Sequence, residues 1–253
     1  MRFQSMQPWH YFLRLSYKQH PMRLFTVLLL LVAFTSANAQ THEIKVSQFT
    51  DINVFGPFKV KLVKSQTCRA EIDYNGIDAG DVTAKCTNDE LIIKIKNKGF
   101  FDFMDDHDRR GSHAWAIVTI YYTSLENIEI KGGATLRAAN SIVEPRLNLI
   151  SQMGSDVRLQ LDVKEFSLES SMGSQVELSG IVDEAKIKAK MGSEVDASEL
   201  KCQEVSVSAS MGADVKVFAE KELNASANFG ASISSKGNPR HRHTSEFFGA
   251  DIH

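Results

Sequence analysis

The sequence predicts an all-β protein: a single-domain parallel β-helix, or solenoid, with coils of about 19–20 residues and the right-handed sense usual for parallel crossovers. Three observations predict this fold. A short motif recurs at almost constant spacing, apolar and polar residues alternate strictly around it, and turn signals separate the remaining strand-like segments. Beyond the N-terminal apolar run, the chain shows no helical pattern.

Residues 1–39 are expected to be a signal peptide. Met22-Arg23 precedes an apolar run over 24–34, which is followed by Ser36-Ala37-Asn38-Ala39. A basic start, a short apolar core and an Ala-x-Ala end are the features that signal peptidase recognises. The chain could start at Met22, and a long basic region before the apolar run is the alternative.

Cleavage after Ala39 would leave residues 40–253 as one β-solenoid domain. We expect this domain to be exported to the periplasm, the outer-membrane surface or the extracellular medium. The apolar run is shorter than the ~20 residues of a membrane-spanning helix, and no later segment is long enough either. No mature membrane span is therefore expected.

Charge argues against nucleic acid as a partner. The whole chain has 29 basic and 31 acidic residues. Residues 1–39 contain four basic and no acidic residues, so 25 basic and 31 acidic residues follow, for a net charge of −6. A mildly acidic surface does not attract phosphate backbones. The sequence also lacks a basic cluster interleaved with aromatic residues.

Three cysteines, Cys68, Cys86 and Cys202, follow the signal segment. An exported protein can form disulfides, and Cys68 and Cys86 could bridge neighbouring strands. The odd count argues against a disulfide framework. The simpler interpretation is that all three are small buried residues.

The strongest signal is a tripeptide of the form Met/Phe/Gly-Gly-Ser/Ala. It recurs seven times, with its glycines at Gly133, Gly154, Gly173, Gly192, Gly212, Gly230 and Gly249. Successive glycines are 21, 19, 19, 20, 18 and 19 residues apart, which predicts stacked coils of one repeat each. We interpret each tripeptide as a corner of the coil. The first residue is expected to fill the interior, the glycine to turn with positive φ, and Ser or Ala to fit the crowded bend.

Between the corners, apolar and polar residues alternate with a period of two, as in half-buried strands. One inward ladder is expected from Val157, Val176, Val195, Val215, Ile233 and Ile252. A second is expected from Met153, Met172, Met191, Met211, Phe229 and Phe248.

The first half repeats less visibly and is interpreted as the opening coils with longer excursions. Turn signals such as Asn75-Gly76 separate its strand-like segments. Strands are expected at Glu43–Ser47, Phe58–Val63, Arg69–Tyr74, Leu91–Lys96 and Ala116–Tyr122. The largest excursion is Lys98–His113.

Three motifs resemble those of the head GIN domain family, domain of unknown function 2807, which is labelled an auto-transporter adhesin head. The segments 49–54 (FTDINV) and 56–60 (GPFKV) are similar to its opening, and the Gly-Ser or Gly-Ala corners to its body. Lys236-Gly237-Asn238-Pro239 before a last Gly-Ala corner is similar to its close. The resemblance covers roughly residues 48–252 and implies an envelope protein with a parallel β-helix. Methionine at four successive corners and the His-rich insertion after Pro239 depart from the family's pattern.

The position two residues after each corner glycine is polar from Gly154 onwards. Its residues are Asp156, Gln175, Glu194, Asp214, Ser232 and Asp251. On stacked coils they would form one outward row, able to bind Ca²⁺ or to hydrogen-bond a glycan, although a solvated face is the simpler interpretation. The sequence has no calcium-binding glycine-aspartate repeat and singles out no carboxylate pair for glycoside hydrolysis. We expect Asp156, Gln175, Glu194, Asp214 and Asp251 to form a ligand-binding surface, with no catalytic residue, metal site or cofactor.

Two further segments carry residue types that bind metals. Asp102–His113 holds four Asp and two His, but it lacks the spacing of an EF-hand, and an exposed loop is the simpler interpretation. His241 and His243 would share one face of a strand and could bind Zn²⁺ or Cu²⁺ with a third ligand such as His253. A solvated turn is the simpler interpretation of that segment.

These observations favour a non-enzymatic, adhesin-like exported protein of the envelope or surface, which binds a glycan or an envelope protein along a rigid face. A polysaccharide-acting enzyme on the same scaffold and a purely structural envelope spacer are the alternatives. Exposed terminal edges of a solenoid invite pairing, so a homodimer is a further expectation.

Overall fold

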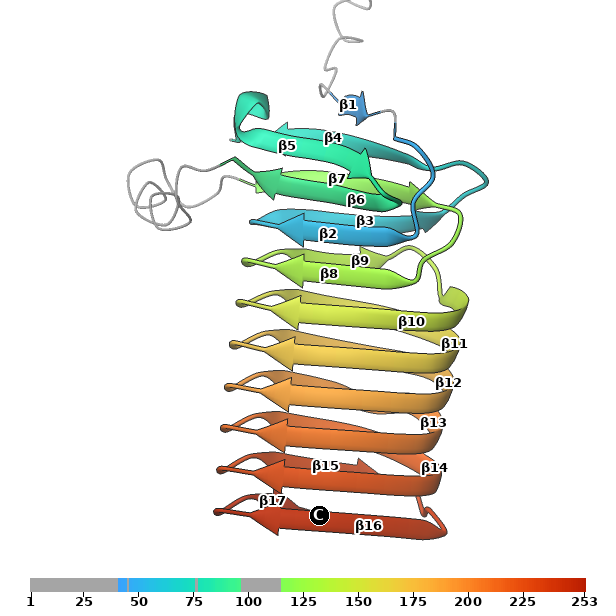
Figure 1. The fold of residues 1–253 in the computed structure, drawn as a ribbon, viewed down its shortest axis with the longest axis vertical. Coiled ribbons are helices and arrows are strands. Elements are labelled where there is room, and N and C mark those ends of the chain that lie inside the picture. Colours follow the sequence, from blue (N-terminus) through green and yellow to red (C-terminus); the bar gives the residue numbers. More distant parts are fainter. Residues whose placement is uncertain (1–40, 45, 76, 97–114) are drawn as a thin grey trace, which may run out of the picture. The chain divides into compact units, whose positions relative to one another are not determined.

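The computed structural model describes residues 41–44, 46–75, 77–96 and 115–253 (Figure 1). Residues Gln40–His253 form one compact unit. Its strands belong to a single sheet that winds into a solenoid with a back and a front layer. In the view of Figure 1 the chain runs left to right along the back, returns along the front and descends, so the coil is right-handed. The predicted fold class is confirmed. The expected signal segment 1–39 and the excursion Lys98–His113 lie outside the described residues.

The described chain holds one short 3-10 turn, η1, at Ala79–Asp81, and no helix in it could cross a membrane. The strands before the regular coils are β1 (Thr41–Ile44), β2 (Asp51–Phe55), β3 (Phe58–Lys64), β4 (Arg69–Asn75), β5 (Val82–Thr87), β6 (Glu90–Ile95), β7 (Trp115–Tyr122), β8 (Asn127–Lys131) and β9 (Thr135–Ala138). The regular coils are β10 (Ile142–Gln152), β11 (Asp156–Ser171), β12 (Gln175–Lys190), β13 (Glu194–Ser210) and β14 (Asp214–Asn228). The last coil consists of β15 (Ser232–Lys236), β16 (His241–Phe247) and β17 (Asp251–Ile252).

The regular coils stack in parallel and in register. Val157 pairs with Val176, Val176 with Val195, and Val195 with Val215. Each of these valines is buried, as is Ile233 in the next coil, so this inward ladder is confirmed. Alternate burial runs along every long strand, because successive side chains of a strand point to opposite faces.

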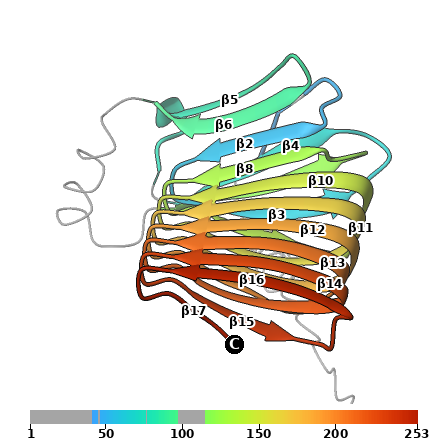
Figure 2. The same ribbon diagram turned by 60° about the horizontal axis from the view of Figure 1, so that its bottom comes forward.

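Each long strand crosses from the back layer to the front layer without interruption, as Figure 2 shows from below. In β12 the bend lies near Gly180, whose φ is +114°. A Cβ on Gly180 would lie 2.0 Å from the Leu161 carbonyl oxygen of the coil before it. Glycine is therefore required there by a close approach between two backbones.

The corners at the opposite edge have two consecutive residues with positive φ. Met191 has φ 52° and Gly192 has φ 66°, and the Ser193 N–H donates to the Lys190 carbonyl across the turn. Two such residues in succession are characteristic of a type I′ turn, which suits the twist of adjoining strands. The predicted positive φ of the corner glycines is confirmed at all seven positions, from Gly133 to Gly249.

The interpretation of the corner methionines as interior residues is wrong. Met172, Met191 and Met211 are exposed, with 47%, 43% and 52% of their surface accessible. Phe229 and Phe248 have larger accessible fractions, 59% and 76%. The left-handed turn directs the first corner residue outward, while the third residue, such as Ser193, is buried. When the inward-outward alternation of the strand is continued through the turn, it therefore places the first corner residue on the wrong side.

Hydrogen bonds from coil to coil hold the corners in place. The Gly192 N–H donates to the Met211 carbonyl of the next coil at 3.0 Å, and equivalent bonds join the other corners. The buried hydroxyl of Ser193 donates to the Ser170 carbonyl of the coil before, at 3.0 Å. Ser155 and Ser174 make the same kind of bond, so these buried hydroxyls are satisfied.

The N-terminal end differs from the expected run of opening coils. The coil of β2 and β3 lies between that of β6 and β7 and that of β8 and β9, so the stacking order is not the chain order. Strands β4 and β5 run antiparallel to β7 and β6, and β1 runs antiparallel to β4. The expected strands exist near their predicted positions, but β1, β4 and β5 form an antiparallel cap over the first coil.

We predict that Gly180→Ala destabilises the protein far more than Gly192→Ala. At Gly192, φ is +66° and no atom lies within 4 Å of an added Cβ. The cost should be about 1–2 kcal/mol at Gly192, from backbone strain alone, and about 3 kcal/mol or more at Gly180, where the backbones must move apart. Urea unfolding followed by circular dichroism measures both losses.

Gly192→Val should cost more than Gly192→Ala, because a β-branched side chain tolerates a left-handed backbone poorly. An unchanged unfolding midpoint for Gly192→Val would contradict this account of the corner. Equal losses for the two alanine variants would contradict the account of Gly180.

Candidate binding surface

The outward row predicted from the sequence exists. Asp156 pairs in register with Gln175, Gln175 with Glu194, and Glu194 with Asp214. The row continues through Ser232 to Asp251. All of these residues are exposed or half-buried and lie at the start of a back-layer strand, directly after a corner. The row is therefore a continuous polar line along the stack, and a binding role for it stays a prediction.

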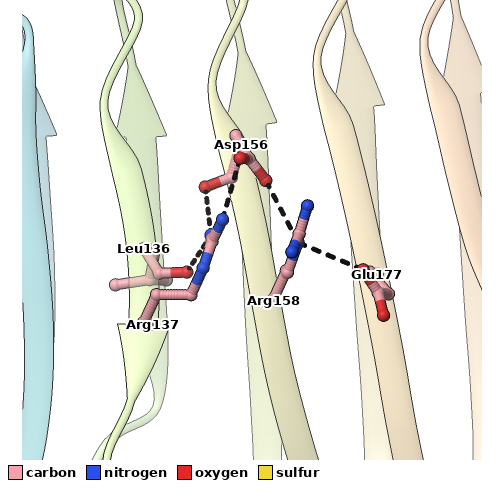
Figure 3. Close-up of polar contacts among 5 residues, drawn as sticks. All are labelled: Leu136, Arg137, Asp156, Arg158 and Glu177. Carbon is pink, nitrogen blue, oxygen red and sulfur yellow. Dashed lines mark hydrogen bonds and ion pairs between the residues drawn. The ribbon is translucent and has the colours of Figure 1, made fainter.

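Arginines neutralise the first member of the row (Figure 3). The Arg137 guanidinium donates to the Asp156 carboxylate at 2.8 Å and also to the carbonyls of Leu136 and Asp156. On the other side, the Arg158 Nε lies 3.9 Å from Asp156 and 3.1 Å from Glu177. This end of the row is a closed network of paired charges, which leaves little charge free for a ligand.

The middle of the row is different. Within the described chain, the carboxylates of Glu194 and Asp214 have no ion pair and no side-chain hydrogen bond. At the far end, Asp251 lies 3.2 Å from the His253 ring. Glu194 and Asp214 are thus adjacent exposed carboxylates whose charge remains available to a partner.

A neighbouring carboxylate, Asp196, has its own partners. Partial burial tends to raise its pKa, but hydrogen bonding with Ser198 and the charges of Lys216 and Lys236 outweigh burial, so the pKa lies below the ordinary value. The Ser198 N–H donates to Asp196 Oδ1 at 3.0 Å, and Lys216 Nζ lies 3.7 Å from Oδ2. Asp196 is therefore held as a carboxylate, the opposite of what a general acid requires.

Beside the row runs a line of exposed apolar side chains that sequence reasoning missed. It is called the apolar edge and consists of Met172, Met191, Met211, Phe229 and Phe248. The last two rings stack in parallel, with centroids 5.0 Å apart and planes at 1°. The sequence carried no signal for this line, because the positive φ of the residue before each corner glycine, which turns its side chain out of the core, is a property of the folded turn.

On the front layer lies a trough of about 420 Å³. Short side chains line its floor and walls, among them Ser206, Ser208 and Ser226, with Lys186 and Lys188 at one end and His243 at the other. The trough arises because two outward rows of serine and asparagine leave space between them. No site was predicted on it from the sequence.

No group of three or more His, Cys, Asp or Glu in the described residues is arranged to hold a metal ion. The Asp- and His-rich segment 102–113 lies outside those residues. His241 and His243 belong to strand β16, so the expected solvated turn is a strand, and both residues are exposed. The three cysteines are free thiols. Burial, together with the charge of Glu220, raises the pKa of Cys202 to about 12, which keeps this thiol neutral, while Cys68 and Cys86 are half-buried.

Comparisons with known proteins agree with this architecture. A family model described as "Putative auto-transporter adhesin, head GIN domain" matches residues 48–239. A crystal structure of a putative adhesin from Bacteroides fragilis has 19% identity and a TM-score of 0.72, covering 84% of this chain and 94% of its own. A putative lipid binding protein from Parabacteroides distasonis has 15% identity and a TM-score of 0.63, covering 86% and 98%.

A putative adhesin from Parabacteroides merdae has 16% identity and a TM-score of 0.56, covering 85% of this chain and 95% of its own. At these identities the likeness shows a shared fold. No curated protein matches the sequence. The family match spans most of the chain and coincides with the coils described above, from β2 to the end of β15. The chain belongs to the head GIN domain family of adhesin-like proteins.

Proposed function

We propose that this protein is a non-enzymatic, adhesin-like module of the cell envelope or surface that binds a protein partner along the apolar edge and the adjoining carboxylates. The observation that carries the proposal is the apolar edge itself. Met191, Met211 and Phe229 repeat at successive coils, and Glu194 and Asp214 follow two of them in the chain. A row of exposed apolar side chains of this kind is typical of an interaction surface.

The corner geometry supports tight binding by such a surface. The backbone under each side chain is fixed by coil-to-coil hydrogen bonds, so little backbone entropy is lost when a partner binds. Each apolar side chain contributes roughly 25 cal/mol per Å² of surface that the partner covers. Because these side chains repeat from coil to coil on one rigid stack, their small contributions to the binding free energy add up. Methionine suits this role because its flexible side chain adapts to a partner's surface.

The chemistry of the edge favours a polypeptide with apolar and basic side chains over a glycan. Thioether and phenyl groups at Met191, Met211 and Phe229 donate no strong hydrogen bonds, which sugar hydroxyls need. Glu194 and Asp214, in contrast, are exposed carboxylates, and carboxylates of this kind pair with Lys or Arg of a partner. An envelope protein is therefore the partner that fits best, and a glycan is the other outcome of the test below.

Two observations support a non-enzymatic role. Asp196 lines a concavity of about 200 Å³ together with Asp156, Gln175 and Glu194 of the outward row, and its pKa is lowered rather than raised. Glycoside hydrolysis needs a carboxyl with a raised pKa opposite a second carboxylate. The family match and two of the three similar structures are also described as putative adhesins, while the third is described as a putative lipid binding protein. The polysaccharide-acting alternative lacks comparable support.

The triple variant Met191→Ser, Met211→Ser, Phe229→Ser should lose binding. All three side chains are exposed, so the fold should persist while the apolar contact area disappears. The matched control is Ile181→Ser, which removes an apolar side chain that is 57% exposed at the opposite bend. Surface plasmon resonance against immobilised panels of purified envelope proteins and glycans measures the difference.

We expect binding to one or more envelope proteins, weakened at least about 30-fold by the triple variant and unchanged by Ile181→Ser. Glu194→Gln with Asp214→Asn should weaken the same interaction and reduce its salt dependence. Binding to glycans alone, or equal binding by the triple variant and the parent, would contradict the proposed surface. An absence of any binding would favour the structural-spacer alternative.

Export makes a separate prediction. If residues 1–39 are a signal peptide, the exported protein should begin at Gln40, because the Ala-x-Ala sequence ends at Ala39. Mass spectrometry of the protein recovered from the periplasm, surface and medium of the producing cell gives both the first residue and the compartment. Ala37→Asp with Ala39→Asp should block cleavage. A cytoplasmic protein that retains its N-terminal segment would contradict export.

A further inference from the structure

The last coil breaks the pattern of the coils before it. Leu223, Ala225 and Ala227 of β14 point inward and are buried, and their partners in β16 are Arg242, Thr244 and Glu246. These three polar residues occupy core-facing positions at the open end of the stack, and every residue of β16 is exposed. Figure 2 shows β16 and β17 at this open end.

In the described chain, β16 pairs with β14 alone, so its other edge carries unpaired backbone N–H and C=O groups. An edge strand of seven residues with free hydrogen-bonding groups is a template for another strand. Beside it, Phe247 and Phe248 are 54% and 76% exposed. The end of the stack therefore combines an open strand edge, exposed aromatic rings and charges at positions that are apolar elsewhere.

We propose that this end binds a second copy of the chain, and that β16 pairs antiparallel with β16 of that copy about a two-fold axis at Thr244. The axis would run from the front layer to the back layer, so the front layers of the two copies would join into one sheet. A two-fold contact of this kind uses the same surface twice and closes on itself, which limits the assembly to a dimer.

The sequence of β16 is self-complementary in this register. A two-fold axis perpendicular to the sheet keeps each side chain on its own face. Residues of one face have either all odd or all even numbers, so an odd-numbered residue can only lie opposite an odd-numbered residue of the second copy, and an even-numbered one opposite an even-numbered one. Centring on Thr244 pairs all seven residues, from His241 to Phe247. It also places Arg242 opposite Glu246 of the second copy, twice over. Other permitted centres shorten the overlap and do not pair these two charges.

This arrangement accounts for the polar residues at inward positions. In the dimer, the two Arg–Glu pairs and the two Thr244 side chains would lie between the ends of the two apolar cores. Pairing of opposite charges across strands stabilises the correct register, and a like-charge pair there opposes association. Phe247 would lie opposite His241 of the second copy and lose much of its exposure. The dimer rests on none of the residues of the apolar edge that the proposed function needs for binding, from Met191 to Phe229.

The test uses charge reversal, with analytical ultracentrifugation of the purified protein between about 1 and 100 µM, a range that detects a micromolar dissociation constant. The parent protein should be a dimer in the upper part of this range. Arg242→Glu and Glu246→Arg should each weaken the dimer at least about 30-fold, because each places two like-charge pairs in the interface. The doubly reversed variant should dimerise again.

A mixture provides the sharpest result. Chains with Arg242→Glu and chains with Glu246→Arg each repel their own kind, but together they restore both opposite-charge pairs. Mixing the two variants should therefore produce a heterodimer from two monomeric samples. Lys188→Glu, a charge reversal on the front of β12 away from the open end, is the matched control and should remain dimeric. Circular dichroism confirms that each variant is folded.

A parent protein that is monomeric throughout the range would overturn the proposal. A dimer that survives both single reversals, or variants that fail to associate when mixed, would overturn the β16 register. The triple Met191, Met211, Phe229 variant should dimerise like the parent. Failure of the proposed binding function would thus be distinguishable from failure of the dimer.

Discussion

Backbone hydrogen bonding between successive coils is the constraint on which the rest of the structure depends. From β11 to β14 almost every residue faces an equivalent residue in the next coil, as Val176 faces Val195. A slip of one residue would turn every inward side chain outward, so each coil must return in register. The corners ensure this return, because the Gly192 N–H and its equivalents bond to the carbonyl of the next corner. Coil length varies where the register shifts, as between Glu177 and Ser179 of β12, opposite which β13 has one residue more.

Stacking converts each position of the coil into a row of like side chains. The inward positions give a continuous apolar core, and the buried third residue of each corner must be small. Ser193 and Ala213 are both buried at that position, so small size is the common requirement, and the serine hydroxyl adds a hydrogen bond to the coil before. The same conversion applies outside the core. One exposed methionine would be an isolated apolar residue, whereas a repeat of exposed corner residues is an extended surface.

The two ends of a solenoid have the same physical problem and different solutions. At the N-terminal end the strands β1, β4 and β5 run antiparallel to their neighbours and cover the first coil. At the other end β16 has an open edge and polar residues at its core-facing positions. Charged residues on an edge strand prevent indiscriminate pairing. In β16 the order of Arg242 and Glu246 permits one specific, self-complementary pairing.

The sequence by itself determined the fold class, the corner glycines, the valine ladder and the outward row from Asp156 to Asp251. It could do so because strand alternation and repeat length are local properties of the chain, and stacking merely copies them from coil to coil. Only the tertiary structure decided that the corner methionines face outward. Their left-handed backbone conformation interrupts the inward-outward alternation of side chains that holds along the strands. The tertiary structure also decided that β2 and β3 are inserted between later coils, that Gly180 meets the Leu161 backbone, and that Arg137 neutralises Asp156. These features depend on which segments meet across the stack, and no local sequence pattern around these residues predicts which residues they contact.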